Sequence, residues 1–374
     1  MTLAKEQERL APRLIKPQSP VRQSNFELLR ILLMLMIVAY HLRGYGGFGS
    51  LPGATGSRVL LYLLTLGGKV GVDCFVLLSG YFMCTYTGGG LRPRRLLKLW
   101  MQLFFYSAGI YIAMGLAGIS RFGAEGNFTY FLPVSRNVYW FGTRYFFLML
   151  LSPFLNKLMQ GMTRKEYRRL LAVCTVIVSV LPTLLRTGYA IPNMTLMLYL
   201  YLLAGYLRLH PEPLFQRKWL ALGMAVGSYL FMVGYTLAHS WLLPRLPFLR
   251  FLPRQNFSPG NSIPALLCAL GLFLFFRNLK VRGNRAVNLI ASGAFGVYLL
   301  HDHSKPLREW LWLDIFDARP LLARPAALAW HIIWVVLAIF AIGILIDLFR
   351  QYVLEKPLFY LIDKTKFGKK YLHD

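Results

Sequence analysis

Runs of about 20 apolar residues recur along the chain, separated by short polar or basic segments. A helix of that length crosses the hydrocarbon layer of a bilayer. We therefore predict an all-α integral membrane protein with about ten transmembrane helices. The predicted spans are 25–43, 59–84, 97–119, 138–156, 170–186, 193–208, 219–241, 261–277, 286–303 and 326–349.

Positive charge is unevenly distributed between the segments that connect these spans. If the N-terminus lies inside the cell and cations at the very ends of a span are counted with the adjoining segment, the inner segments hold 27 of the 42 Lys and Arg residues and the outer loops hold 12. Such an excess marks the cytoplasmic side of a membrane protein, so both termini are predicted to be cytoplasmic. The chain then divides into a cytoplasmic N-terminal segment (1–24), a ten-helix membrane domain (25–350) and a basic cytoplasmic C-terminal tail (351–374).

Composition supports this class and excludes others. Of the 374 residues, 56% are hydrophobic, which is more than is usual in a soluble protein. The net charge of +27 is concentrated in the inner segments, where it would meet anionic lipid, so we expect a lipid bilayer as partner and no nucleic acid. The four cysteines lie in predicted spans without C-x-x-C spacing, so no metal site is expected.

Two ionisable residues share one face of the first predicted span. Arg30 and His41 are separated by ten apolar or aromatic residues, which brings them within about 20° of one another and about 16 Å apart along the axis. Charged groups in a span are costly and suggest function. His41 is our candidate general base, and a packed, hydrogen-bonded histidine is the alternative. Arg30 could clamp an anionic donor, unless it snorkels or pairs with Glu27.

The second span and the basic segment after it add four candidates. Lys69 and Asp73 lie four residues apart, so they either neutralise each other or leave Asp73 to orient and charge His41. The glycines around them favour close helix approach. Arg95 and Lys98 lie three residues apart at a helix start, where they could hold phosphates or simply mark the inner side.

The outer ends of two later spans hold candidates for contact with an acceptor. Arg144 begins the fourth span and could bind acceptor or a developing oxyanion, with snorkelling as the alternative. His301 ends the ninth span and could contact acceptor or serve as an interfacial hydrogen-bonding residue. In the 304–325 segment, Trp310 and Trp312 alternate with charges, which predicts an interfacial helix.

Taken in order, these motifs resemble the acyltransferase 3 family over nearly the whole chain. Asn25 to Arg30, followed by Ile31 to His41, resembles its opening helix with an Arg/Lys-x10-His signature. Arg95-x-x-Lys98 resembles its R-x-x-R motif, with Lys in the last place. Further matches are Gly71 to Tyr81 in the second span, Tyr139 to Asn156 in the fourth and Ser292 to His301 in the ninth.

The resemblance implies an O-acyltransferase of the polysaccharide-modifying type in a bacterial cytoplasmic membrane. That family most often moves acetyl from acetyl-CoA to hydroxyls of sugars or other acceptors at the outer face. On this view His41 and Asp73 are catalytic, and Arg144 and His301 bind the acceptor. Arg30, Arg95 and Lys98 would hold the acetyl-CoA donor.

A transporter or flippase with an intramembrane charged path is the alternative function. A transporter would be expected to show internal repeats and broken helices in both halves, and the sequence contains no convincing repeat. The basic inner cluster together with a single intramembrane histidine favours the enzyme. Acceptor identity, acyl chain and oligomeric state are left open by the sequence.

Overall fold

The computed structural model describes residues 23–48, 55–86, 90–123, 128–185, 193–243, 245–246 and 257–372. All regular structure within these ranges is helical, which confirms the all-α class. Each of the ten predicted apolar segments contains helix. The predicted N-terminal segment lies almost wholly outside the described residues.

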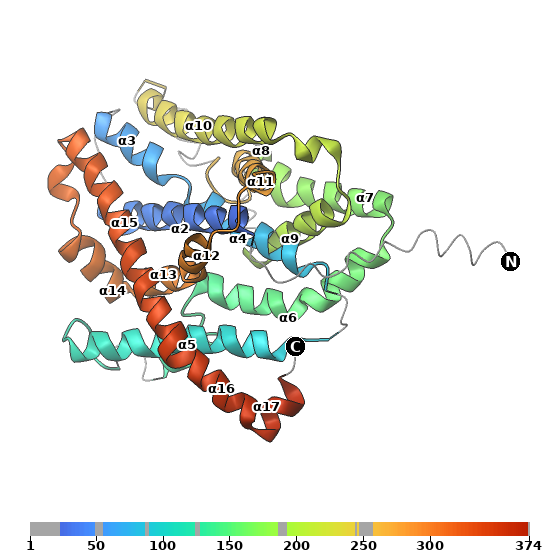
Figure 1. Ribbon diagram of the computed structural model, residues 1–374. Helices are drawn as coiled ribbons and strands as arrows, with labels where there is room; N and C mark the ends of the chain where they lie inside the picture. The colour runs from blue at the N-terminus through green and yellow to red at the C-terminus, as the bar shows by residue number, and fades with distance from the viewer. Residues whose placement is uncertain are drawn as a thin grey trace.

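The helices follow one another along the chain with short connections (Figure 1). Several begin with proline in the first turn, where the missing N–H costs nothing. The helices are α2 (Ser24–Tyr45), α3 (Gly56–Thr65), α4 (Gly68–Met83), α5 (Pro93–Leu116), α6 (Trp140–Gly161), α7 (Arg164–Thr175), α8 (Leu181–Leu185), α9 (Asn193–Leu209), α10 (Lys218–Leu242), α11 (Ile263–Arg277), α12 (Arg285–Ser292), α13 (Ala294–His301), α14 (Lys305–Glu309), α15 (Pro325–Phe349), α16 (Lys356–Lys364) and α17 (Lys366–Tyr371).

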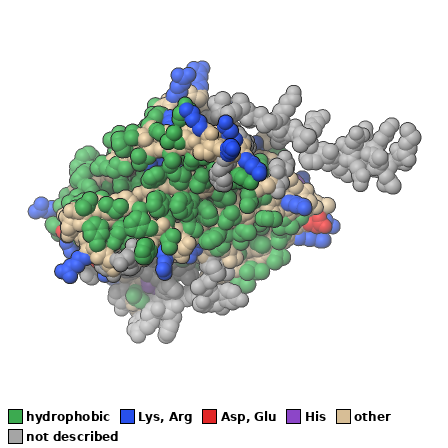
Figure 2. Space-filling model, turned by 90° about the horizontal axis from the view of Figure 1, so that it is seen from below, with side chains coloured by type: hydrophobic (Ala, Val, Ile, Leu, Met, Phe, Trp, Pro, Cys, Tyr) green, Lys and Arg blue, Asp and Glu red, His purple; other side chains and the backbone are tan. Residues whose placement is uncertain are grey.

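Within the described residues, six helical segments are long and apolar enough to cross a membrane. They are Ser24–Tyr45, Gly56–Met83, Pro93–Leu116, Arg164–Leu185, Lys218–Leu242 and Pro325–Lys364. The surface agrees, because hydrophobic side chains cover the middle of the face in Figure 2 and Lys and Arg lie mostly at its margins. The protein is thus a multi-pass membrane protein, while the count of ten spans and the cytoplasmic termini stay predictions.

Three predicted segments differ in detail from the structure. The segment 59–84 is divided at Leu66 and Gly67 into the end of α3 and α4. The segment 286–303 is divided at Gly293 into α12 and α13, with Gly293 packed against Ile344 of α15. The predicted C-terminal tail is helical over most of its length, because a π-helical turn (Arg350–Glu355) carries the chain from α15 into α16 and α17. These features depend on packing or on local helix geometry, which the spacing of apolar residues does not indicate.

Helix α2 lies in the middle of the bundle and packs against α4, α11, α12, α13 and α15 (Figure 1). Glycines make the α2–α4 approach close. A Cβ atom on Gly68 would lie 2.2 Å from Cβ of Tyr40, and one on Gly71 would lie 3.0 Å from the carbonyl oxygen of Leu33. This confirms the close approach predicted from the glycines. It brings the Lys69 side of α4 against the His41 end of α2.

Candidate active site

The candidate active site begins at His41, which is buried near the C-terminal end of α2. Its Nδ1 lies 2.9 Å from Nε2 of His301, and Nδ1 of His301 lies 2.5 Å from the carbonyl oxygen of Val297. A carbonyl can only accept, so His301 donates from Nδ1 and its Nε2 accepts from the Nδ1–H of His41. This assignment leaves Nε2 of His41 as the unprotonated, basic nitrogen.

A carboxylate faces that basic nitrogen. Oδ2 of Asp302 lies 3.9 Å from Nε2 of His41, too far for a hydrogen bond but close enough to pair with the imidazolium. The carboxylate is held from its other side, because Tyr45 and Arg308 donate to its Oδ1 at 3.2 and 3.4 Å. Asp302 is therefore fixed where a positive charge on His41 would develop.

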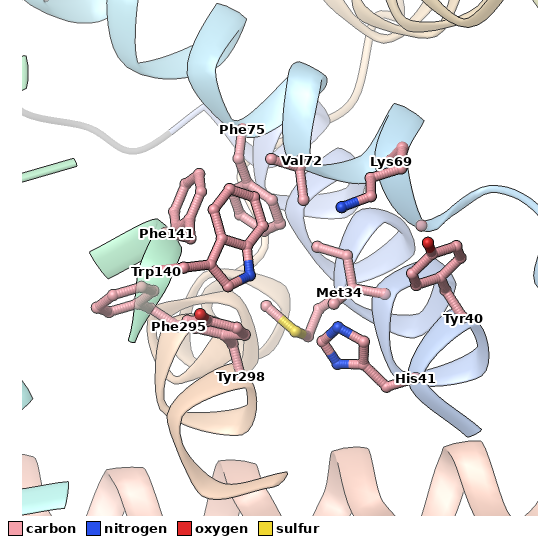
Figure 3. Close-up of a pocket in the computed structure, with 12 residues that line it drawn as sticks. Met34, Tyr40, His41, Lys69, Val72, Phe75, Trp140, Phe141, Phe295 and Tyr298 are labelled. Atoms are coloured by element: carbon pink, nitrogen blue, oxygen red, sulfur yellow. The ribbon is translucent and has the colours of Figure 1, made fainter. Parts of the chain in front are cut away.

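The ring of His41 also lines a small cavity of about 30 Å³, drawn in Figure 3. The walls come from four helices, α2, α4, α6 and α13, and consist mainly of aromatic and aliphatic side chains. The ammonium of Lys69 is the one charged group among the lining residues while His41 is neutral. Apart from His41 and Lys69, the lining residues are Met34, Ile37, Tyr40, Gly68, Val72, Phe75, Trp140, Phe141, Phe295 and Tyr298. The volume corresponds to about two water molecules, so only a small group fits beside the histidine.

Lys69 projects into this cavity rather than pairing with Asp73. Its Nζ lies 5.0 Å from the ring centre of Trp140 and 5.7 Å from that of Tyr40, within range of cation–π attraction. No ion pair joins Lys69 to Asp73, although the structure describes both residues. The predicted neutralising pair is therefore not formed. A cation beside a histidine in an apolar cavity is poised to meet negative charge.

Asp73 follows Val72 on α4 but, unlike Val72, is not among the residues that line the cavity. Its carboxylate is buried against Gly260, which precedes α11, and one of its oxygens has no hydrogen-bond partner among the described residues. Both ring nitrogens of His41 face other groups, as described above. The contact predicted between Asp73 and His41 is thus corrected, because the carboxylate at the histidine is Asp302.

The predicted donor residues lie on the described surface with partners of their own. Arg30 pairs with Glu27, one turn earlier on α2, which is the local pair left open by the sequence. Lys98 pairs with Glu355 at 2.6 Å although its side chain stays 56% exposed. Arg95 lines a small cleft between the end of α4 and the middle of α6. The structure does not bring these three cations onto one common partner.

The two residues predicted to meet the acceptor are placed differently from one another. Arg144 donates to the carbonyl of Trp140 at 2.8 Å and lines a separate open groove, so it does not reach the His41 cavity. His301 is fully buried with both ring nitrogens engaged, which leaves it no free nitrogen for a substrate. The predicted acceptor contact of His301 is therefore corrected to a contact with His41.

Sequence reasoning did not select Asp302, Tyr45 or Arg308 as site residues, and it gave Lys69 no role beside His41. For Asp302, however, the predicted topology contains an indication. In the predicted topology, the first and ninth spans both run outward, so His41 and the polar triplet that starts at His301 lie near the same membrane face. The two helix ends could thus have been paired before the structure was known.

Comparison with known proteins identifies one family. A family model for an acyltransferase domain matches residues 23–350, which include α2 to α15 and every predicted site residue. No curated protein and no solved structure matches the chain.

Proposed function

The chain belongs to the acyltransferase 3 family, and from this premise we propose that it moves an acetyl group from cytoplasmic acetyl-CoA to a hydroxyl of a cell-surface or lipid-linked sugar. The observation that carries the proposal is the buried arrangement of His41, His301 and Asp302 beside a small cavity. A bacterial cytoplasmic membrane is the location that fits such a reaction, because the donor is inside and the modified glycan outside.

In the proposed reaction His41 acts as general base. The acceptor hydroxyl donates to Nε2 of His41, and the proton moves there as the oxygen attacks the thioester carbonyl. Collapse of the tetrahedral intermediate expels the CoA thiolate, which takes the proton from the imidazolium, so atoms and charge balance. The geometry supports two helpers: His301 fixes the tautomer, and Asp302 stabilises the imidazolium.

Lys69 is the proposed stabiliser of the oxyanion. It is the only cation other than a protonated His41 among the residues that line the small cavity, and the rings of Trp140 and Tyr40 hold it there. A fixed cation in an apolar, water-poor site stabilises developing charge far better than one in water. The cavity volume of about 30 Å³ supports acetyl rather than a long acyl chain as the group transferred.

Donor binding is proposed for Arg30, Arg95 and Lys98, following the family motifs. Arg30 and Lys98 already pair with Glu27 and Glu355. The Lys98 side chain is half-exposed, and the buried Glu355 keeps Arg350 as a second ion-pair partner, so Lys98 can exchange Glu355 for a phosphate of CoA at small cost. Arg95 lines the cleft between α4 and α6, which acetyl-CoA could enter from the predicted cytoplasmic side.

The experiment is transfer of label from [¹⁴C]acetyl-CoA by the purified protein reconstituted in liposomes with a glycan-bearing envelope extract. The proposal predicts protein-dependent release of CoA and alkali-labile label in the glycan fraction, as expected for an O-ester. Release of CoA without label in glycan would overturn the sugar acceptor. Neither release nor label, with uptake of label by intact liposomes, would favour the transporter.

A further inference from the structure

We propose that a second cavity, between α5 and α14, is the acceptor subsite and binds a neutral, hydroxyl-rich sugar ring. This inference rests on the proposed function and names where its acceptor lies. The cavity measures about 400 Å³, against about 30 Å³ beside His41. It is thus large enough for a sugar residue, which the smaller cavity is not.

One wall of this cavity is a rigid stack of three rings. Tyr111 and Tyr130 stack at 4.8 Å between ring centres, and Tyr130 stacks on His303 at 4.6 Å, each pair tilted by 22°. Ser107 of α5 holds the stack from behind, because its hydroxyl donates to the carbonyl of Tyr130 at 2.6 Å. The inner faces of the stack cover one another, so the ring surface left for the apolar C–H face of a pyranose belongs to the half-buried Tyr111 and Trp310, which both line the cavity.

His303 offers the stacked wall a polar contact that no described residue of the chain fills. Its Nε2 lies 3.0 Å from the carbonyl oxygen of Ser107, so Nε2 carries the proton and Nδ1 is an acceptor. Within the part of the chain that the structure describes, that Nδ1 has no hydrogen-bond partner, although the residue lies in the cavity wall and is only 4% exposed. Buried acceptors without a donor are rare and costly, so the site calls for a hydroxyl.

The remaining polar lining fits a neutral ligand. Glu309 and Asp314 are exposed carboxylates that accept hydrogen bonds, and Arg121 is a donor. Glu309 has Lys305 as an ion-pair partner at 3.7 Å, but both side chains are more than half exposed and the pair is easily exchanged. The two carboxylates would repel a negatively charged phosphate ligand. An acyl chain would leave the carboxylates and Nδ1 of His303 without hydrogen-bond donors.

The position of the cavity connects it with the base. His303 lies in its wall, and the preceding residue, Asp302, faces His41. Helix α14 and the C-terminal end of α5 lie at the same end of the bundle as the His41 end of α2, on the left in Figure 1. The predicted topology places this end at the outer face, where a glycan would arrive. A sugar in this cavity therefore lies beside His303, whose neighbour in sequence, Asp302, is the charge partner of His41.

Binding can be tested without catalysis by saturation-transfer NMR on the full protein in nanodiscs. The probe is a mixture of the methyl glycosides of glucose, galactose and N-acetylglucosamine. We expect saturation transfer to sugar ring protons in the wild type. The double variant Glu309→Gln/Asp314→Asn should bind at least about tenfold more weakly, because it loses charge-assisted hydrogen bonds.

Asp317→Asn is the matched control, since this carboxylate lies on the same segment outside the cavity and pairs with Arg319. It should bind the glycosides like the wild type. No saturation transfer in the wild type, or an equal signal in the double variant, would overturn the subsite. Glycoside binding by a protein that fails to transfer acetyl would instead overturn the proposed reaction and leave the subsite standing.

Discussion

Replacing Asp302 by Asn should slow acyl transfer more than any other single change of a carboxylate. Asn keeps the shape of the side chain and can accept from Tyr45, but it removes the negative charge 3.9 Å from Nε2 of His41. At an effective dielectric constant of ~20, that charge pair is worth roughly 4 kcal/mol. The proton is only partly transferred in the transition state, so about half of this, or a loss of about 30-fold in turnover, is expected.

The assay is the initial rate of acetyl transfer at saturating acetyl-CoA, divided by the amount of inserted protein from an immunoblot. Asp73→Asn is the matched control, because Asp73 is equally buried but its carboxylate lies against Gly260. It should lose clearly less activity than Asp302→Asn. Wild-type turnover in Asp302→Asn, or an equal loss in both variants, would refute the assignment of the charge partner.

Three further predictions concern the donor, the helix interface and the topology. Arg95→Ala and Lys98→Ala should raise the apparent KM for acetyl-CoA and leave donor-saturated turnover closer to normal; unchanged donor affinity would make these residues a topology signal only. Gly68→Ala should overpack the contact with α2, destabilise the fold by about 1–3 kcal/mol and lower the melting temperature. Gly109→Ala is the control, because there is open space around Gly109, and it should not lower the melting temperature. Equal melting temperatures of the two variants would contradict the close packing of α4 on α2. A reporter fused at Asp374 should give a cytoplasmic signal, and a signal from the outer side would mean that a span is miscounted.

Much of the fold could be predicted because a bilayer imposes a strong constraint on sequence. A helix must be apolar for about 20 residues to cross it, so the ten helical segments are visible as runs of apolar residues. The break at Gly293 was not predictable in the same way. It arises where a glycine meets Ile344, more than 50 residues later, and apolar periodicity carries no information about such contacts.

The candidate base could be predicted for the same reason, since a histidine within an apolar helix is conspicuous. Its partners could not be chosen so simply. Asp73 is close to His41 in the predicted helix order, whereas Asp302 is 261 residues away and reaches it only because α13 packs on α2. The sequence shows Lys69 four residues before Asp73, but the Lys69 side chain points toward the rings of Trp140 and Tyr40 and not toward the Asp73 carboxylate.

The role of His41 as general base is tested by the amount of acetylated product per unit of inserted protein for His41→Ala. Transfer should be abolished while the protein still inserts, because the span becomes more apolar. His41→Gln should likewise transfer little and still bind acetyl-CoA. Product near the wild-type level from His41→Ala would remove the base from the mechanism and favour a transporter.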